Sequence, residues 1–214
     1  MAIVNGYATT NQLKAAIRMG TADTIDDPLL EMAIESASRL IDDDCNRVFY
    51  SSATAITRSF VANDGYIVDI DDAITVATVA TDDDGSFAFA TTWGTADYQK
   101  EPLNGLSGGQ AWPTTSLRAI GSRIFPSTMY GANIHAGSTG AANVRITGTW
   151  GFGTAVPTEV VQGCILQSSR IYKRLDAPFG VAGFGDMGVV RVSRTDPDVY
   201  ALISRYRRAK VATA

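Results

Sequence analysis

The sequence has few of the residue types on which enzymes and metal proteins depend. Its 214 residues include one histidine, His135, and two cysteines, Cys45 and Cys164. One histidine excludes a histidine-rich zinc site, and His135 lies in a polar segment where we expect a plain exposed side chain. The cysteines lie far apart in segments of helical pattern, so we expect small buried residues and not a disulfide or metal pair. We therefore predict no enzyme activity, no cofactor and no metal.

Long apolar runs and an excess of basic residues are also missing. No stretch approaches the roughly 18 apolar residues of a membrane-spanning helix, and the start MAIVNGYATT lacks the basic and apolar regions of a signal peptide. We expect a soluble, unexported product without a membrane partner. The formal net charge of -4 argues against a protein that neutralises many phosphates to hold nucleic acid.

The charges that are present are unevenly distributed. Residues 21–45 carry eight acidic residues and one arginine, whereas residues 166–210 carry nine basic and four acidic residues. These ends could be two solvated helix faces, or complementary surfaces for a head-to-tail contact between copies. Asp42, Asp43 and Asp44 fall at the helix end where the dipole disfavours acids, which suggests a partner, either internal or on a neighbouring subunit.

Helical periodicity occupies both ends of the chain. Capping residues, proline in first turns and apolar residues at spacings of three and four mark each helix. The predicted helices run from Thr10 to Gly20, from a cap at Asp26 or Asp27 to about Cys45, from Pro157–Thr158 to Leu175, and from a cap at Asp196 into the basic end RYRRAK.

The middle of the chain has the texture of strands. Short alternating runs rich in Thr, Val, Ile and aromatics extend from about Ser52 to Phe152. They are ATAITRSFVA, YIVDI, ITVATVA, FAFATTW, DYQKE, SLRAIGSRIF and NVRITGTW. Asp84-Gly85 predicts a hairpin turn, and the polar loops 102–115 and 126–142 are candidates for mobile or partner-contacting segments.

This order of elements predicts an α+β protein. We expect the N- and C-terminal helices, residues 1–51 and 153–210, to form one helical bundle. The β-rich residues 52–152 would be a large antiparallel insertion that emerges from it.

Two patterns with possible chemistry are weak. Gly183, Gly185 and Gly188 form GxGxxG, but a helix precedes it and the strand VVRVS follows, the reverse of a dinucleotide-binding loop. The clusters Asp69, Asp71, Asp72 and Asp82–Asp84 lack the ligand spacing of a calcium loop. A calcium-dependent hydrolase that uses Asp71 and Asp72 stays as a rival hypothesis.

Residues 144–174, VRITGTWGFGTAVPTEVVQGCILQSSRIYKR, carry a resemblance. A strand that ends in Thr-Gly-x-Trp-Gly-aromatic, followed by x-Val-Pro and an amphipathic helix, resembles the head-tail connector, or adaptor, proteins of long-tailed bacteriophages. The segments YATTNQLKAAI, DDPLLEMAIESASRLIDDDCNRVFY, DYQKEP and DPDVYALISRYRR look similar to other parts of that family. The fold motif comprises Trp150, Gly151, Phe152 and Pro157, and we expect Trp150 and Phe152 to anchor the strand end against the bundle.

The resemblance implies a structural protein of the virion neck, made in the host cytoplasm. The resemblance implies that twelve copies of it would form a homo-oligomeric ring that joins the portal to downstream neck, stopper or tail proteins. The ring would extend the channel for genome DNA, which acidic groups let pass without specific binding. The alternative is another neck or tail component, either a stopper or a decoration and binding module.

We also predict which surfaces meet partners. The first proposed portal-facing element is the C-terminal helix and its tail, because exposed Tyr and Arg are favoured at interface hot spots; the alternative is an ordinary basic helix end. The second is loop 177–188, which would become ordered on docking. The residues are Tyr200, Arg205, Arg207 and Arg208 in the helix and its tail, Phe179, Phe184 and Met187 in the loop, and Asp42, Asp43 and Asp44 on the intersubunit acidic face.

Overall fold

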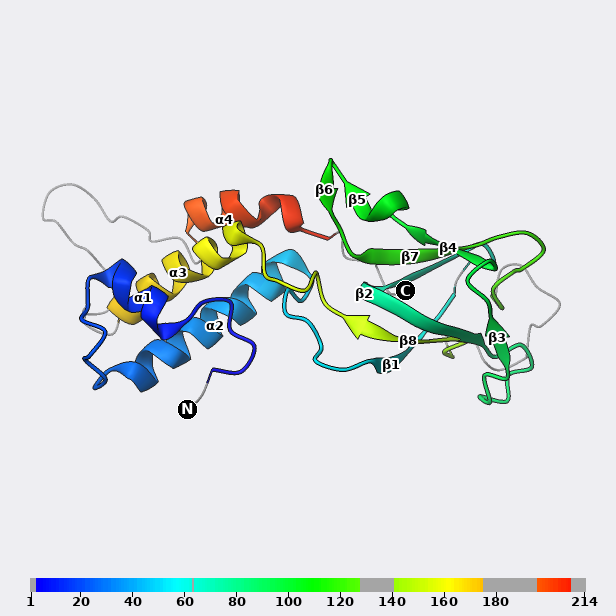
Figure 1. Cartoon of the computed structure of the whole chain (residues 1–214), viewed down its shortest axis with the longest axis horizontal. Coiled ribbons are helices and arrows are strands. Elements are labelled where there is room, and N and C mark those ends of the chain that lie inside the picture. The colour runs from blue at the N-terminus through cyan, green and yellow to red at the C-terminus, as the bar shows by residue number, and fades with distance from the viewer. Residues whose placement is uncertain (1–2, 63, 128–140, 175–195, 209–214) are drawn as a thin grey trace, which may run out of the picture. The chain divides into compact units, whose positions relative to one another are not determined.

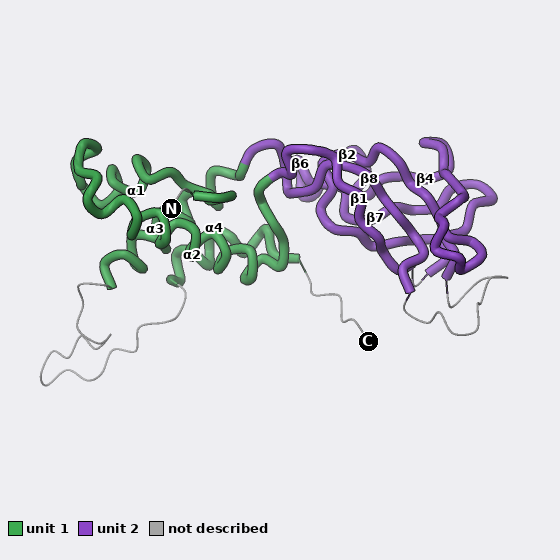
Figure 2. Tube along the Cα trace, turned by 90° about the horizontal axis from the view of Figure 1, so that it is seen from below, with its two compact units in different colours: residues 1–50, 156–214 green, residues 51–155 purple. Residues whose placement is uncertain are grey.

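The computed structural model describes residues 3–62, 64–127, 141–174 and 196–208. It divides into two compact units (Figures 1 and 2). The helical unit comprises residues 1–50 and 156–214, and the β unit comprises residues 51–155. The predicted mixture of helices and antiparallel strands is confirmed. Among the described residues no helix has the length and hydrophobicity needed to cross a membrane.

The helical unit contains four α-helices and one short 3-10 turn among its described residues. They are α1 (Thr10–Ile17), α2 (Asp27–Cys45), α3 (Thr158–Lys173), α4 (Pro197–Ile203) and η3 (Ser204–Tyr206).

Three of the predicted helix boundaries were wrong. Thr9, and not Thr10, caps α1, because its hydroxyl accepts from the Gln12 N–H while the Gln12 side chain accepts from the Thr9 N–H. The helix ends before Gly20, because Arg18 adopts a left-handed conformation with φ 60°. The basic end of the chain is also less helical than predicted, since α4 stops at Ile203 and continues only as η3.

Small residues allow α2, α3 and α4 to pack closely. Ser38 and Cys164 meet between α2 and α3, with their side-chain oxygen and sulfur 3.5 Å apart. Gly163 faces Val199 and Ile203 of α4, where an added Cβ would be 3.4 Å from Ile203 Cγ2. Both cysteines are buried and free, as predicted.

Among its described residues, the β unit contains one six-stranded antiparallel sheet and one small hairpin. The sheet order is β1-β8-β2-β7-β4, and β3 also pairs with β2; β5 pairs with β6 in the separate hairpin. The 3-10 turn η1 (Leu103–Gly105) lies in the chain between β4 and β5. The strands are β1 (Ile56–Phe60), β2 (Ile67–Thr81), β3 (Thr91–Trp93), β4 (Tyr98–Glu101), β5 (Leu106–Ser107), β6 (Gln110–Ala111), β7 (Thr114–Ala119) and β8 (Val144–Trp150).

The runs YIVDI and ITVATVA, predicted as two strands, form the single strand β2. The acidic residues between them do not break it, because the Arg58 guanidinium lies 2.7 Å from the Asp71 carboxylate and the Gly151 N–H donates to the Asp72 carbonyl oxygen at 2.8 Å. Its pairing with β8 is irregular, with register shifts between Ala73 and Thr75 and between Val76 and Thr78.

Gly148 lies between these two irregularities, where it pairs with Val76. A Cβ at this position would lie only 2.0 Å from the Thr75 carbonyl oxygen. Glycine therefore allows the two backbones to approach, which is its usual role beside a bulge.

Trp150 belongs to the core of the β unit, a position that the sequence did not predict. Its ring lies in the core of the β unit with strand residues such as Ile70 and Ile146, and its indole Nε1–H donates to the Ile56 carbonyl oxygen at 2.7 Å. Phe152 makes an edge contact with Trp112, also in the β unit, with ring centroids 5.2 Å apart. Both rings therefore pack against residues of the β unit.

The strands predicted at FAFATTW and SLRAIGSRIF are longer than the observed strands β3 and β7. In FAFATTW only Thr91–Trp93 is strand, because the hairpin from β2 has a wide connection in which Phe87 and Phe89 have positive φ. In SLRAIGSRIF the strand β7 ends at Ala119, and Gly121 turns the chain with φ 69°. β2 and β3 do form the predicted hairpin, but residues 82–90 connect them in place of the tight turn predicted at Asp84-Gly85.

Candidate functional site

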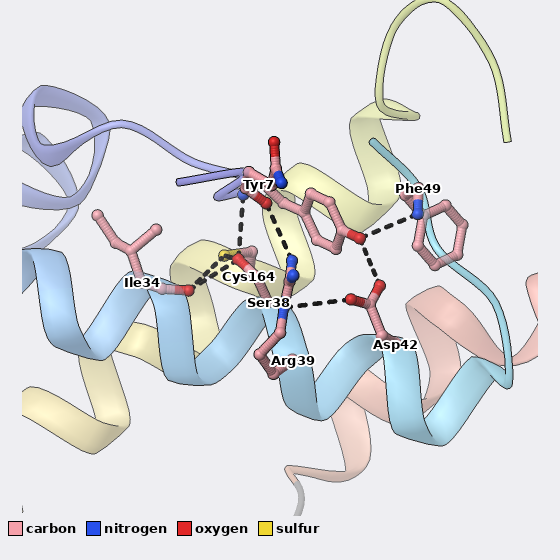
Figure 3. Close-up of polar contacts among 8 residues, drawn as sticks. Tyr7, Ile34, Ser38, Arg39, Asp42, Phe49 and Cys164 are labelled. Carbon is pink, nitrogen blue, oxygen red and sulfur yellow. Dashed lines mark hydrogen bonds and ion pairs between the residues drawn. The ribbon is translucent and has the colours of Figure 1, made fainter. Parts of the chain in front are cut away.

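The end of α2 carries the acidic residues for which the sequence suggests a partner. Asp42 is tied to the rest of the helical unit: the Tyr7 hydroxyl donates to its carboxylate, and Arg39 Nε lies 3.2 Å from the same group (Figure 3). The Tyr7 oxygen also accepts from the Phe49 N–H at 2.9 Å. Asp42 therefore has internal partners, which join the segment before α1 to the segment after α2.

Burial controls the protonation of this network. It raises the pKa of Asp42 to about 6, although the Tyr7 hydrogen bond and the charge of Arg39 both act to lower it. Burial and the neighbouring Asp42 also hold the pKa of Tyr7 far above its usual value, so its hydroxyl keeps its proton. At neutral pH the Tyr7 hydroxyl is therefore protonated and donates, and the Asp42 carboxylate accepts.

Arg39 completes the network from the same helix. Its guanidinium donates to the Asn5 carbonyl oxygen at 3.0 Å and lies 5.6 Å from the Tyr7 ring centroid and 5.4 Å from that of Tyr50. The one cation among the acidic residues of 21–45 thus covers two aromatic rings.

The C-terminal segment is attached to the end of α2. Arg207 Nε donates to the Asp44 carbonyl oxygen at 2.9 Å, and its guanidinium lies 4.0 Å from the Asp44 carboxylate. The Arg208 N–H donates to the Cys45 carbonyl oxygen, also at 2.9 Å. Carbonyl groups in the last turn of a helix have no partner within it, so these donors complete α2 and place positive charge where the dipole favours it.

Arg205 of the C-terminal segment pairs with Glu159 of α3. It lies 3.4 Å from a Glu159 carboxylate oxygen, and the Tyr206 hydroxyl donates to the other oxygen at 3.0 Å. A backbone hydrogen bond and then Tyr206 hold the pKa of Glu159 below its usual value. Tyr200 remains 46% exposed, and its hydroxyl accepts from Arg207 at 2.7 Å.

The structure thus joins two groups of residues that the sequence assigned to different contacts. Asp44 of the acidic face meets Arg207 of the proposed portal-facing segment inside one chain. Asp43 is exposed. The site also includes Tyr7, Arg39 and Glu159, which were not predicted. The partners of Tyr7 and Glu159 are distant in sequence, whereas Arg39 lies only three residues from Asp42.

The other predicted positions are placed as follows. Asp71 forms its ion pair with Arg58, and Asp82 and Asp84 accept hydrogen bonds from the loop that follows them. The part of the chain that the structure describes holds no group of three or more acidic, His or Cys side chains suited to a metal ion. Several predicted residues lie outside the described residues: Phe179, Phe184, Met187, His135 and the glycines at 183, 185 and 188.

Comparison with solved structures gives the class of fold. The chain is similar to a chain in the neck of an empty gene transfer agent particle with sixfold symmetry, with 17% identity and a TM-score of 0.59. It is also similar to a chain of the native gene transfer agent virion (18%, 0.56) and to one in the native neck with twelvefold symmetry (16%, 0.52). Each match covers 100% of this chain and 96% of the other.

These matches show that the chain has the fold of these three chains. No protein-family model and no curated protein matches it in sequence.

Proposed function

We propose that this chain is a structural protein of the neck of a phage-like particle. Copies form a ring that joins the portal to the tail and extends the channel for DNA. The observation that carries this proposal is the likeness to gene transfer agent neck chains, because it covers both units and not a single common motif. The symmetry of those necks supports a ring of twelve copies.

The chemistry of the chain supports an assembly role. The net charge is -4, and two basic residues of the C-terminal segment, Arg207 and Arg205, are paired with Asp44 and Glu159. A channel built from such subunits does not bind phosphates strongly, so DNA passes through it. No catalytic activity belongs to this function.

The portal contact is proposed at the C-terminal segment. Arg205 and Arg207 are half-exposed, but each is already paired with a carboxylate of its own chain. We therefore propose that their main contribution to portal binding is to hold Tyr200 in position, and not to offer an unpaired charge. The Tyr200 ring lies 4.5 Å from the Arg207 guanidinium, which holds an exposed aromatic group in place for a partner. Asp43 and the exposed part of Asp44 are proposed to face a neighbouring subunit.

Deletion of the gene from a particle-producing strain tests the function. A neck protein is needed to join two finished parts, so we expect filled or leaking heads and separate tails. Particles that keep their tails would contradict the neck role and favour a decoration module. Complementation with the wild-type gene controls for effects on neighbouring genes.

A further inference from the structure

Asp82, the first residue after β2, has a buried carboxylate oxygen without a hydrogen-bond partner. The residue is 6% exposed, and its Oδ2 accepts from the Phe87 N–H at 3.1 Å. Its Oδ1 is shielded from solvent, and no donor among the described residues reaches it. A charged oxygen that loses water without gaining a hydrogen bond or a counter-ion costs free energy. The orphaned oxygen of Asp82 therefore points to a cation.

Asp84 brings a second carboxylate to the same place. Hydrogen bonds from Ser86 hold the pKa of Asp84 below its usual range, and the Asp82 carboxylate interacts with the same group. Two ionised carboxylates that lie so close repel each other unless a proton or a cation lies between them. Among the described residues no lysine or arginine forms an ion pair with either carboxylate. The pair therefore lacks the positive charge that it needs.

The connection between β2 and β3, residues 82–90, holds these groups in place. Asp84 Oδ1 accepts from the Ser86 N–H at 3.0 Å and from the Ser86 hydroxyl at 2.6 Å, so these bonds leave Asp84 Oδ2 out. The Asp82 N–H donates to the Asn143 carbonyl oxygen at 3.0 Å, which ties the start of the connection to the residue before β8. One oxygen of each carboxylate thus has its orientation fixed by the chain.

The available ligands suit calcium. This ion takes about six to eight oxygen ligands from carboxylates, carbonyl groups and water. Asp82, Asp84 and Ser86 occupy alternate positions, as the first three ligands of a calcium loop do, a spacing that residues 82–84 alone do not have. Trp93 stands where such a loop has its closing glutamate, so carbonyl and water oxygens must complete the shell. A metal that prefers nitrogen or sulfur ligands is not favoured by this all-oxygen set.

We propose that residues 82–86 bind a calcium ion through the carboxylates of Asp82 and Asp84. The ion neutralises the buried carboxylate and joins the end of β2 to the connection that leads to β3. Two carboxylates give a weak site, with a dissociation constant on the order of 10⁻⁴–10⁻³ M. The role of the ion is structural, and the site does not depend on the proposed ring.

Thermal denaturation of the full chain with and without calcium tests the site. All three tryptophans, at positions 93, 112 and 150, lie in the β unit, so tryptophan fluorescence follows that unit. Calcium at about 10 mM, compared with EDTA, should raise the melting temperature by about 3 °C or more. An unchanged melting temperature would overturn the proposal, and an equal rise with magnesium would overturn the assignment to calcium.

Asp82→Asn and Asp84→Asn should each abolish the rise caused by calcium. In EDTA, Asp82→Asn should melt at or above the wild-type temperature, because its amide oxygen still accepts from the Phe87 N–H and an uncompensated buried charge is gone. Asp69→Asn is the matched control, since Asp69 is an exposed acid elsewhere in β2. A rise that persists in the first two variants, or disappears in Asp69→Asn, would contradict the site.

Terbium luminescence gives a readout that does not depend on stability. Tb³⁺ occupies calcium sites and emits when a nearby tryptophan is excited. The Trp93 Nε1–H donates to the hydroxyl of Thr81, the residue before Asp82, at 3.1 Å, so this indole is close enough to excite the ion. We expect emission that excess calcium displaces, and Asp84→Asn should weaken terbium binding about tenfold or more. Equal emission from this variant and the wild type would overturn the site.

Discussion

Arg207 donates from its Nε to the backbone carbonyl oxygen of Asp44 at 2.9 Å, which joins the C-terminal segment to the end of α2. We predict that Arg207→Gln lowers the free energy of unfolding of the helical unit by about 1 kcal/mol, since a charge-assisted hydrogen bond at a helix end is lost. Arg205→Gln is the control, because its pair with Glu159 is exposed and should change stability by less than about 0.5 kcal/mol. Urea denaturation followed by circular dichroism measures both. Equal losses would contradict a special role for Arg207.

Asp42 should make stability depend on pH. Its pKa rises from 3.8 to about 6 on folding, so the folded chain holds more protons than the unfolded chain in this window. The free energy of unfolding therefore falls as the pH rises from about 4 to about 6, by on the order of 1 kcal/mol once screening at this partly exposed site is allowed for.

Asp42→Asn isolates this effect. The amide oxygen still accepts from the Tyr7 hydroxyl, but position 42 no longer titrates, so this contribution to the pH slope should disappear. Denaturation midpoints at pH 4.5, 5.5 and 6.5 in both proteins give the comparison. A variant with an unchanged slope would show that other groups set it.

Tyr7→Phe removes a hydroxyl that serves two partners. The Asp42 carboxylate loses a donor and the buried Phe49 N–H loses its acceptor, so we expect a loss of about 1–3 kcal/mol in the free energy of unfolding. Tyr50→Phe keeps the ring that faces Arg39 and should cost less than about 0.5 kcal/mol. A small effect at Tyr7 would mean that water replaces its hydroxyl.

Gly148→Ala tests the close approach of β2 and β8. The new methyl group would meet the Thr75 carbonyl oxygen at 2.0 Å, so the strands must separate and the free energy of unfolding should fall by about 1–3 kcal/mol. Gly94→Ala is the matched control in the same unit, because its nearest atom there is 3.6 Å away. Thermal denaturation of both variants gives the answer, and equal melting temperatures would contradict this account of the bulge.

The long helices could be predicted because their signals are local. Pro28 and the apolar repeat from Leu30 onward fix α2, and Pro157 fixes the start of α3. The capping box of Thr9 and Gln12 was also readable, as Thr followed three residues later by Gln, but was missed.

The site could not be predicted, because its contacts join distant parts of the chain. Tyr7 meets Asp42 across 35 residues, and Arg207 meets Asp44 across 163. The place of Trp150 in the core of the β unit was not predicted, for a similar reason. Its motif marks the strand end, but its neighbours follow from the pairing of β8 with β1 and β2, which no local pattern encodes.

The central claim is that copies of this chain form a ring on the portal, and electron microscopy of the purified protein, alone and mixed with the portal of the same particle, tests it most directly. We predict closed rings, or added density with twelvefold symmetry on the tail side of the portal. Subunits that stay monomeric and leave the portal unchanged would contradict the claim.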